Sequence, residues 1–159
     1  MRTALAASIV AALSTCSAAC YESSAPLSAP GLAIDPALPG SWNCRAVESG
    51  DPVLVRIWRF DERQYYFEIV EDSDVDRYQG YPSRVGDQTL VNVRDLEQKG
   101  SAERWVFVRY ALDGRDRVQF WLIPDTALKG VEPAQALATI RRRVGDATLY
   151  QRVADCRRP

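Results

Sequence analysis

Two cysteines, Cys44 and Cys156, constrain the fold of this 159-residue chain most strongly, because they bracket almost all of the segment with a regular hydrophobic pattern. In an oxidising compartment they are free to pair. The bridge would close a loop of about 110 residues, and the chain-entropy estimate of its stabilisation is nearly 5 kcal/mol at most. Because bridged α-carbons lie within about 7 Å of each other, the first and last structured elements are predicted to be neighbours. Two unpaired buried cysteines are the alternative.

The N-terminus has the pattern of an export signal. Arg2 is followed by a mostly apolar run from Ala4 to Leu13 and then by small residues, an order typical of secretory signals. The apolar run is too short for a bilayer, which needs about 20 residues. We therefore expect residues 1–19 to be a signal peptide.

The end of this signal resembles the lipobox of bacterial lipoproteins, in which a leucine and two small residues precede the lipidated cysteine. Cys16 follows a leucine at the right distance but directly follows a large threonine, whereas Cys20 follows small residues but lacks the leucine. We favour Cys20 as the lipidation site. The alternative is cleavage after Ala19 without lipid, as in soluble secreted proteins.

Residues 20–39 contain four prolines among serines and alanines. This composition predicts an extended linker that would hold a folded domain away from a membrane. Residues 40–157 are then one domain, with enough chain for a single core.

Most of this domain is predicted to be β-structure. Its runs are rich in valine, isoleucine and aromatic residues, which favour strands, and Asp113 and Gly114 are typical of a hairpin turn. The predicted strands are residues 42–47, 53–60, 64–70, 77–81, 89–93, 104–112, 117–123 and 149–154. Eight strands at hairpin spacing favour a mainly β fold, either an antiparallel barrel or a strongly curved sheet.

One α-helix is predicted before the last strand. Pro133 suits the first helical position, Leu137, Ile140 and Val144 fall on one face, and Gly145 suits the C-terminal cap. Three consecutive arginines lie in the last turns, where the helix dipole favours cations. Their structural role is sufficient to explain them.

Gly40, Ser41 and Trp42 form a Gly-x-Trp sequence at the start of the domain. In this motif and in the late helix the chain resembles lipocalins, whose first strand places such a tryptophan across the barrel floor. The resemblance implies an eight-stranded barrel for a small apolar or amphipathic ligand. The family's Thr-Asp-Tyr motif is not present, and its conserved arginine cannot be assigned among several candidates.

Several catalytic chemistries are excluded by composition. The chain has no histidine, which removes Ser-His-Asp and Cys-His triads and imidazole metal sites. Asp72, Asp74 and Asp76 have the spacing of the start of a calcium loop but lack its glycine and closing glutamate, so a solvated acidic turn is the preferred interpretation. We expect no enzymatic activity, no cofactor and no metal.

Five residues are candidates for ligand binding because strand alternation places charges beside large apolar side chains: Arg56, Trp58, Trp105, Phe107 and Arg109. On the inner face of a barrel, either arginine would meet the carboxylate of an amphipathic ligand while the aromatic rings cover its apolar part. The alternative places these charges on the outer face, with a solid core opposite.

These observations predict an exported, lipid-anchored envelope protein, periplasmic or associated with the outer membrane of a bacterium, that binds a small apolar or amphipathic ligand. A soluble secreted protein is the alternative location. The alternative function is a structural lipoprotein with a solid core that engages another envelope protein. Without residues 1–19 the chain has 19 basic and 21 acidic residues, a net charge of −2, which argues against nucleic acid as a partner.

Overall fold

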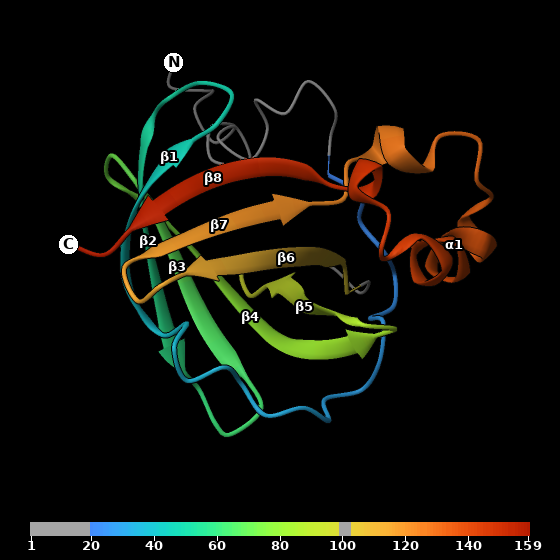
Figure 1. The fold of residues 1–159 in the computed structure, drawn as a ribbon, viewed down its shortest axis with the longest axis horizontal. Coiled ribbons are helices and arrows are strands. Elements are labelled where there is room, and N and C mark those ends of the chain that lie inside the picture. The colour runs from blue at the N-terminus through green and yellow to red at the C-terminus, as the bar shows by residue number, and fades with distance from the viewer. Residues whose placement is uncertain (1–19, 99–102) are drawn as a thin grey trace, which may run out of the picture.

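The computed structural model describes residues 20–98 and 103–159. Within these residues eight antiparallel strands close into a barrel, each beside its neighbour in sequence, with the last beside the first (Figure 1). The strands are β1 (Gly40–Ala46), β2 (Pro52–Arg59), β3 (Tyr65–Glu71), β4 (Asp74–Val85), β5 (Gln88–Asp95), β6 (Trp105–Asp113), β7 (Arg117–Leu122) and β8 (Gln151–Arg157). The predicted mainly β fold is confirmed, and the sheet closes.

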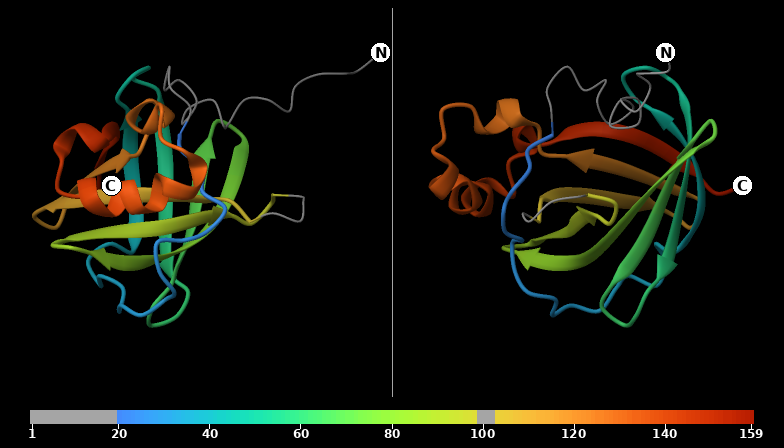
Figure 2. Two further views of the ribbon diagram at one scale, coloured as in Figure 1. Left: turned by 90° about the vertical axis from the view of Figure 1, so that its right-hand side faces the viewer. Right: turned by 180° about the vertical axis from the view of Figure 1, so that it is seen from behind.

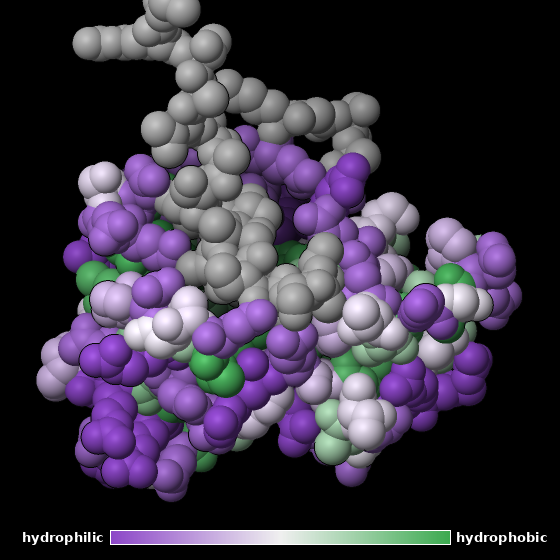
Figure 3. Space-filling view, turned by 90° about the horizontal axis from the view of Figure 1, so that it is seen from above, coloured by the Kyte–Doolittle hydropathy of each residue, from purple (hydrophilic) through white to green (hydrophobic). Residues whose placement is uncertain are grey.

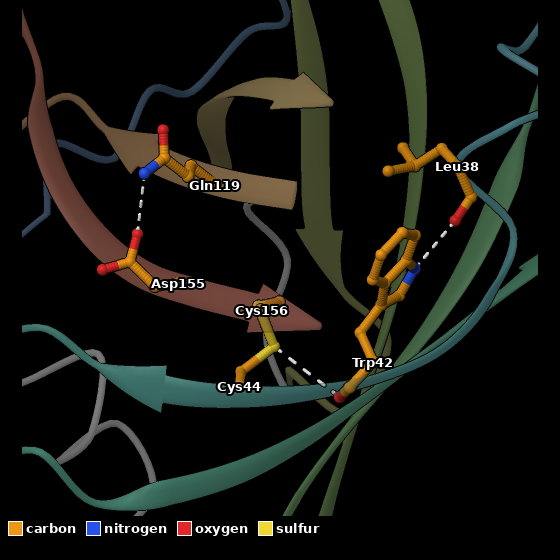
Figure 4. Close-up of a disulfide and its surroundings, with 6 residues drawn as sticks. All are labelled: Leu38, Trp42, Cys44, Gln119, Asp155 and Cys156. Carbon is orange, nitrogen blue, oxygen red and sulfur yellow. Dashed lines mark hydrogen bonds between the residues drawn. A yellow bond between two sulfur atoms is a disulfide. The ribbon is translucent and has the colours of Figure 1, made fainter. Parts of the chain in front are cut away.

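The barrel is joined along β1 and β8 by the predicted disulfide. Cys44 and Cys156 lie directly opposite each other in the ladder, with α-carbons 3.9 Å apart, and their sulfur atoms are bonded (Figure 4). The prediction that the first and last strands are neighbours is therefore confirmed.

The acidic stretch at the end of β3 forms the predicted solvated turn only in part. Only Asp72 and Ser73 form the turn, and Asp72 adopts the left-handed backbone conformation there, with φ of 50°. Glu71 ends β3, and Asp74 begins β4, which is longer than predicted. Glu71 and Asp76 are therefore half-buried on paired strands, whereas Asp72 and Asp74 are exposed.

The predicted helix is α1 (Ala136–Arg143), preceded by the 3₁₀ helix η2 (Pro133–Gln135). Two further 3₁₀ helices are η1 (Asp125–Leu128) and η3 (Ala147–Leu149). Ile140 and Val144 are buried in an apolar cluster with Leu90 and Phe107, which belong to the barrel wall. Helix α1 thus lies beside the barrel and packs on its outer face (Figures 1 and 2). Among the described residues no helix is both long and apolar enough to cross a membrane.

Residues 20–39 are not the extended linker that their prolines predict. This segment runs along the outside of the barrel and under one end (blue in Figure 2). Leu27 is buried, its backbone N–H donates to Asn92 Oδ1 at 2.8 Å, and Tyr81 Oη donates to the Ser28 carbonyl at 2.7 Å. Leu38 is also buried. Spaced leucines fasten the segment to the barrel, and this outweighs the extended character of the prolines. The predicted signal peptide, with Cys16, lies outside the described residues.

Candidate functional site

The inner face of the barrel is mainly apolar, and its acidic residues lie at one end of the strands. Side chains alternate between the two faces of a strand, and on β2 Val55 and Ile57 point inward while Arg56 points outward. Residues directly paired across neighbouring strands share a face, so the same assignment extends from Val55 to its partners Trp42 and Ile69. The strand pairing therefore identifies which residues of each strand point into the barrel.

One end of this interior, which we call the floor, is closed and densely packed. It is formed by Leu38, Trp42, Ile57 and Tyr65, all no more than 1% exposed. The Trp42 indole donates a hydrogen bond to the Leu38 carbonyl at 2.9 Å, so the end of residues 20–39 is fixed across the opening (Figure 4).

An arginine outside the barrel completes the floor. The Arg158 guanidinium lies 4.2 Å from the centroid of the Trp42 ring and donates to the carbonyls of Ala37 and Arg115, each at 2.8 Å. A Cβ at Gly40 would collide with this guanidinium. Gly40 also has a φ of 142°, a backbone conformation that favours glycine, so the first residue of the Gly-x-Trp sequence suits both its backbone and the position of the cation on the tryptophan.

Polar groups within the floor are paired with one another. The Asp35 backbone N–H donates to Tyr65 Oη at 2.7 Å, and Tyr110 Oη donates to Asp35 Oδ2 at 3.2 Å. Burial is the main cause that raises the pKa of both tyrosines, and the Asp35 carboxylate raises the pKa of Tyr110 further. Both hydroxyls therefore stay neutral and hold their hydrogen bonds at physiological pH.

Beyond the floor the interior is hollow. A cavity of about 310 Å³ lies between the strands, a volume at the lower end of small-molecule sites. Its apolar wall includes Val53, Val55, Phe67, Ile69, Val106 and Val108. These side chains point inward yet each is only partly buried. Partial exposure on an inner face is expected where side chains border open space rather than packed neighbours.

The opposite end of the cavity, which we call the mouth, carries charged side chains. Glu71, Asp95, Glu22 and Arg104 line the cavity there, together with Cys20. Arg104 is paired with Glu22 at 2.8 Å. From above, the side where the β1–β2 connection lies in Figure 1, the described residues are mostly hydrophilic (Figure 3). An apolar interior thus has a polar entrance.

None of the five predicted ligand-binding residues lines this cavity. Arg56 is on the outer face and pairs with Glu68 at 3.5 Å, and Trp58 packs there against Tyr66 with ring centroids 5.6 Å apart. Their neighbours Val55 and Ile57 occupy the inner face, so strand alternation forces both candidates outward.

The three candidates on β6 are also on the outer face. Trp105 and Phe107 are buried in the cluster beneath α1, and the Arg109 guanidinium lies 5.4 Å from the Trp121 ring and 5.2 Å from the Tyr150 ring. The prediction that these five residues meet a ligand inside the barrel is wrong. The alternative prediction, charges on the outer face and a solid core inside, is correct for the charges, but the barrel interior contains a cavity.

The sequence reasoning missed the residues of the cavity wall. At the start of β6 both faces are apolar, because Trp105 and Phe107 on the outer face pack into the cluster beneath α1, so alternation there could not distinguish inner from outer. On β2 a signal was present: Val53, Val55 and Ile57 share one parity, which is aliphatic until the strand ends at Arg59, whereas the other parity contains Arg56 in its middle. That contrast would have assigned the inner face correctly.

In comparisons with known proteins, no family model, no curated protein and no solved structure matches the chain.

Proposed function

We propose that this protein is an exported, lipid-anchored binding protein that holds a small apolar or amphipathic molecule inside its barrel. The observation that carries the proposal is the cavity of about 310 Å³, which is lined mainly by aliphatic and aromatic side chains and has its charged lining residues at one end. Small-molecule sites have this composition. The hollow interior favours this function over that of an interaction protein with a solid core.

A lipocalin-like ancestry is part of the proposal. It is supported by eight antiparallel strands in chain order, by Trp42 across the floor and by the helix before the last strand. Arg158, stacked on Trp42, is the position to which the family arginine, unassigned from sequence, would correspond.

Lipidation at Cys20 is consistent with the position of that residue. Cys20 lines the mouth, and its backbone forms an isolated antiparallel β-bridge with Pro124. The N–H of the following Tyr21 donates to the Ile123 carbonyl at 2.9 Å. A lipid on Cys20 would hold the mouth beside the membrane, with no free spacer between them. The disulfide supports export, since such bonds persist in oxidising compartments.

Native mass spectrometry of the mature protein, purified under mild conditions, tests whether a lipid or metabolite accompanies it. Titration with the neutral fluorescent probe N-phenyl-1-naphthylamine then measures binding directly. We expect one probe per barrel. The substitution Val108→Phe places a ring in the cavity and should abolish binding, whereas Val70→Phe, on the outer face of β3, should leave binding unchanged. No bound molecule and no probe binding by the wild-type protein would overturn the proposed function.

A further inference from the structure

Three carboxylates gather on one side of the mouth. Glu71 and Asp95 line the cavity. Asp76 lies on β4, between the strands that carry them, and pairs directly with Ile69, whose side chain also lines the cavity. Because direct partners share a face, Asp76 is on the inner face too. Two of the three acids therefore line the cavity, and Asp76 lies between them on the same face of the sheet.

Three arginines on or beside β4, β5 and β6 form ion pairs with other carboxylates. Arg104 pairs with Glu22 at 2.8 Å and Arg77 with Glu97 at 2.8 Å, while Arg94 pairs with Glu103. Within residues 20–98 and 103–159, no lysine or arginine nitrogen lies within 4.0 Å of the carboxylates of the three mouth acids. Their negative charge is not neutralised by an ion pair in this part of the chain.

The surroundings oppose this negative charge. Partial burial is the main cause that raises the pKa of Glu71 and of Asp76; the next cause is Asp76 for Glu71 and Asp95 for Asp76. Burial, followed by the charges of Asp76 and Asp95, likewise raises the pKa of Tyr78, which lines the cavity beside them. A cation at this position would relieve the repulsion between the carboxylates, and an anion would increase it.

We propose that the ligand of the cavity is a cationic amphiphile, with an alkyl or aryl body and an ammonium group. This rests on the proposed function of the barrel and names the chemical class of its ligand. The body lies against the aliphatic wall formed by residues such as Val55 and Val108. The ammonium group lies at the mouth against Glu71, Asp76 and Asp95, and the ring of Tyr78 is in reach for a cation–π contact.

Three ligands with the same chain but different head groups test the charge preference: decylamine, decanol and decanoate. Each is titrated by calorimetry into the full mature protein, below its micellar concentration. We expect decylamine to bind at least about tenfold more tightly than decanol, the scale of one hydrogen bond to a charged group, and decanoate to bind most weakly.

Two variants assign the preference to the mouth. The double substitution Glu71→Gln and Asp76→Asn should weaken decylamine binding at least about tenfold and leave decanol binding unchanged. The control Glu132→Gln removes an exposed carboxylate before η2 and should alter neither. Unchanged decanol binding also shows that the double variant is folded.

The possible outcomes separate this inference from the proposed function. If no ligand of the three binds, the proposed function fails and this inference fails with it. If decanol and decanoate bind as tightly as decylamine, the cavity is a binding site but the cationic preference is overturned. Saturable binding of Ca²⁺ alone that is lost in the double variant would also overturn it, since the acids would then serve a metal ion.

Discussion

The floor and the mouth of the barrel are built from the same strands but differ in how their inner faces are filled. At the floor, side chains such as Ile57 and Tyr65 are fully buried and the polar groups are paired within the protein. Near the mouth, Ile69 and its neighbours remain partly exposed, and Glu71 forms no ion pair with a described residue. The difference indicates that the packed end holds the wall in place while the hollow end remains available to a ligand.

The largest expected loss of stability follows removal of the disulfide, which links β1 and β8 in the barrel wall between the floor and the mouth. Replacing both Cys44 and Cys156 by serine should lower the free energy of unfolding by about 2–5 kcal/mol, because the unfolded chain is no longer cross-linked. Chemical denaturation measures the loss. Reductant should lower the free energy of unfolding of the wild-type protein to that of the variant and leave the value of the variant unchanged. If reductant does not change the free energy of unfolding of the wild-type protein, the disulfide does not stabilise the fold.

A matched pair of truncations compares the two ends directly. Ile57→Ala at the floor removes a fully buried side chain and should cost about 2–5 kcal/mol of unfolding free energy. Ile69→Ala at the cavity wall should cost roughly half as much or less, because that side chain already borders open space and loses fewer contacts. Equal costs, measured by urea denaturation, would mean that the wall near the mouth is packed as tightly as the floor.

The paired polar groups of the floor should contribute a smaller amount. Tyr110→Phe removes the hydroxyl that donates to Asp35 at 3.2 Å and should lower the free energy of unfolding by roughly 1.5–3 kcal/mol, as for a hydrogen bond to a charged group. Combining it with Asp35→Ala in a double-mutant cycle isolates the pair. Additive effects of the two substitutions would show that the contact does not stabilise the floor.

The smallest effect is expected at the mouth and has the opposite sign. Since the pKa of Glu71 is raised in the folded chain, the folded state binds more protons than the unfolded state as pH rises through ~4.3, and stability falls over that range. Glu71→Gln should therefore raise the free energy of unfolding at pH 7 by about 0.2–1 kcal/mol, and this gain should vanish below about pH 4.

Glu68→Gln is the control for this substitution. Glu68 lies on the outer face of the same strand between Arg56 and Arg77, at 3.5 and 3.8 Å, so its removal should not stabilise the protein. Thermal unfolding at several pH values measures both variants. A gain for Glu68→Gln equal to that for Glu71→Gln would contradict the special position of Glu71.

The elements of the fold could be predicted from local sequence, because each strand and the helix have the composition and period of their class. The β1–β8 seam could be predicted because Cys44 and Cys156 fix a distance between remote positions. The packing of residues 20–39 was missed because proline content outweighed the buried Leu27 and Leu38. Which leucines find a partner depends on surfaces formed elsewhere in the chain.

The site was harder to predict for a related reason. The first residues of β6 are apolar on both faces, and only the position of α1 shows that Phe107 is outside the barrel. The hollow itself is set by the sizes of side chains from several strands at once, which no single segment encodes. Asp76 was assigned to a solvated turn because the pairing that places it on the inner face involves another strand.

The most direct test of the central claim, that the barrel interior is the binding site, is a methyl NMR titration with decanol. The methyl groups of Val55, Ile69 and Val108, which line the cavity, should shift in a saturable manner, while those of Leu90 and Ile140 in the outer cluster beneath α1 should not. Shifts confined to the outer cluster, or none at all, would contradict the account.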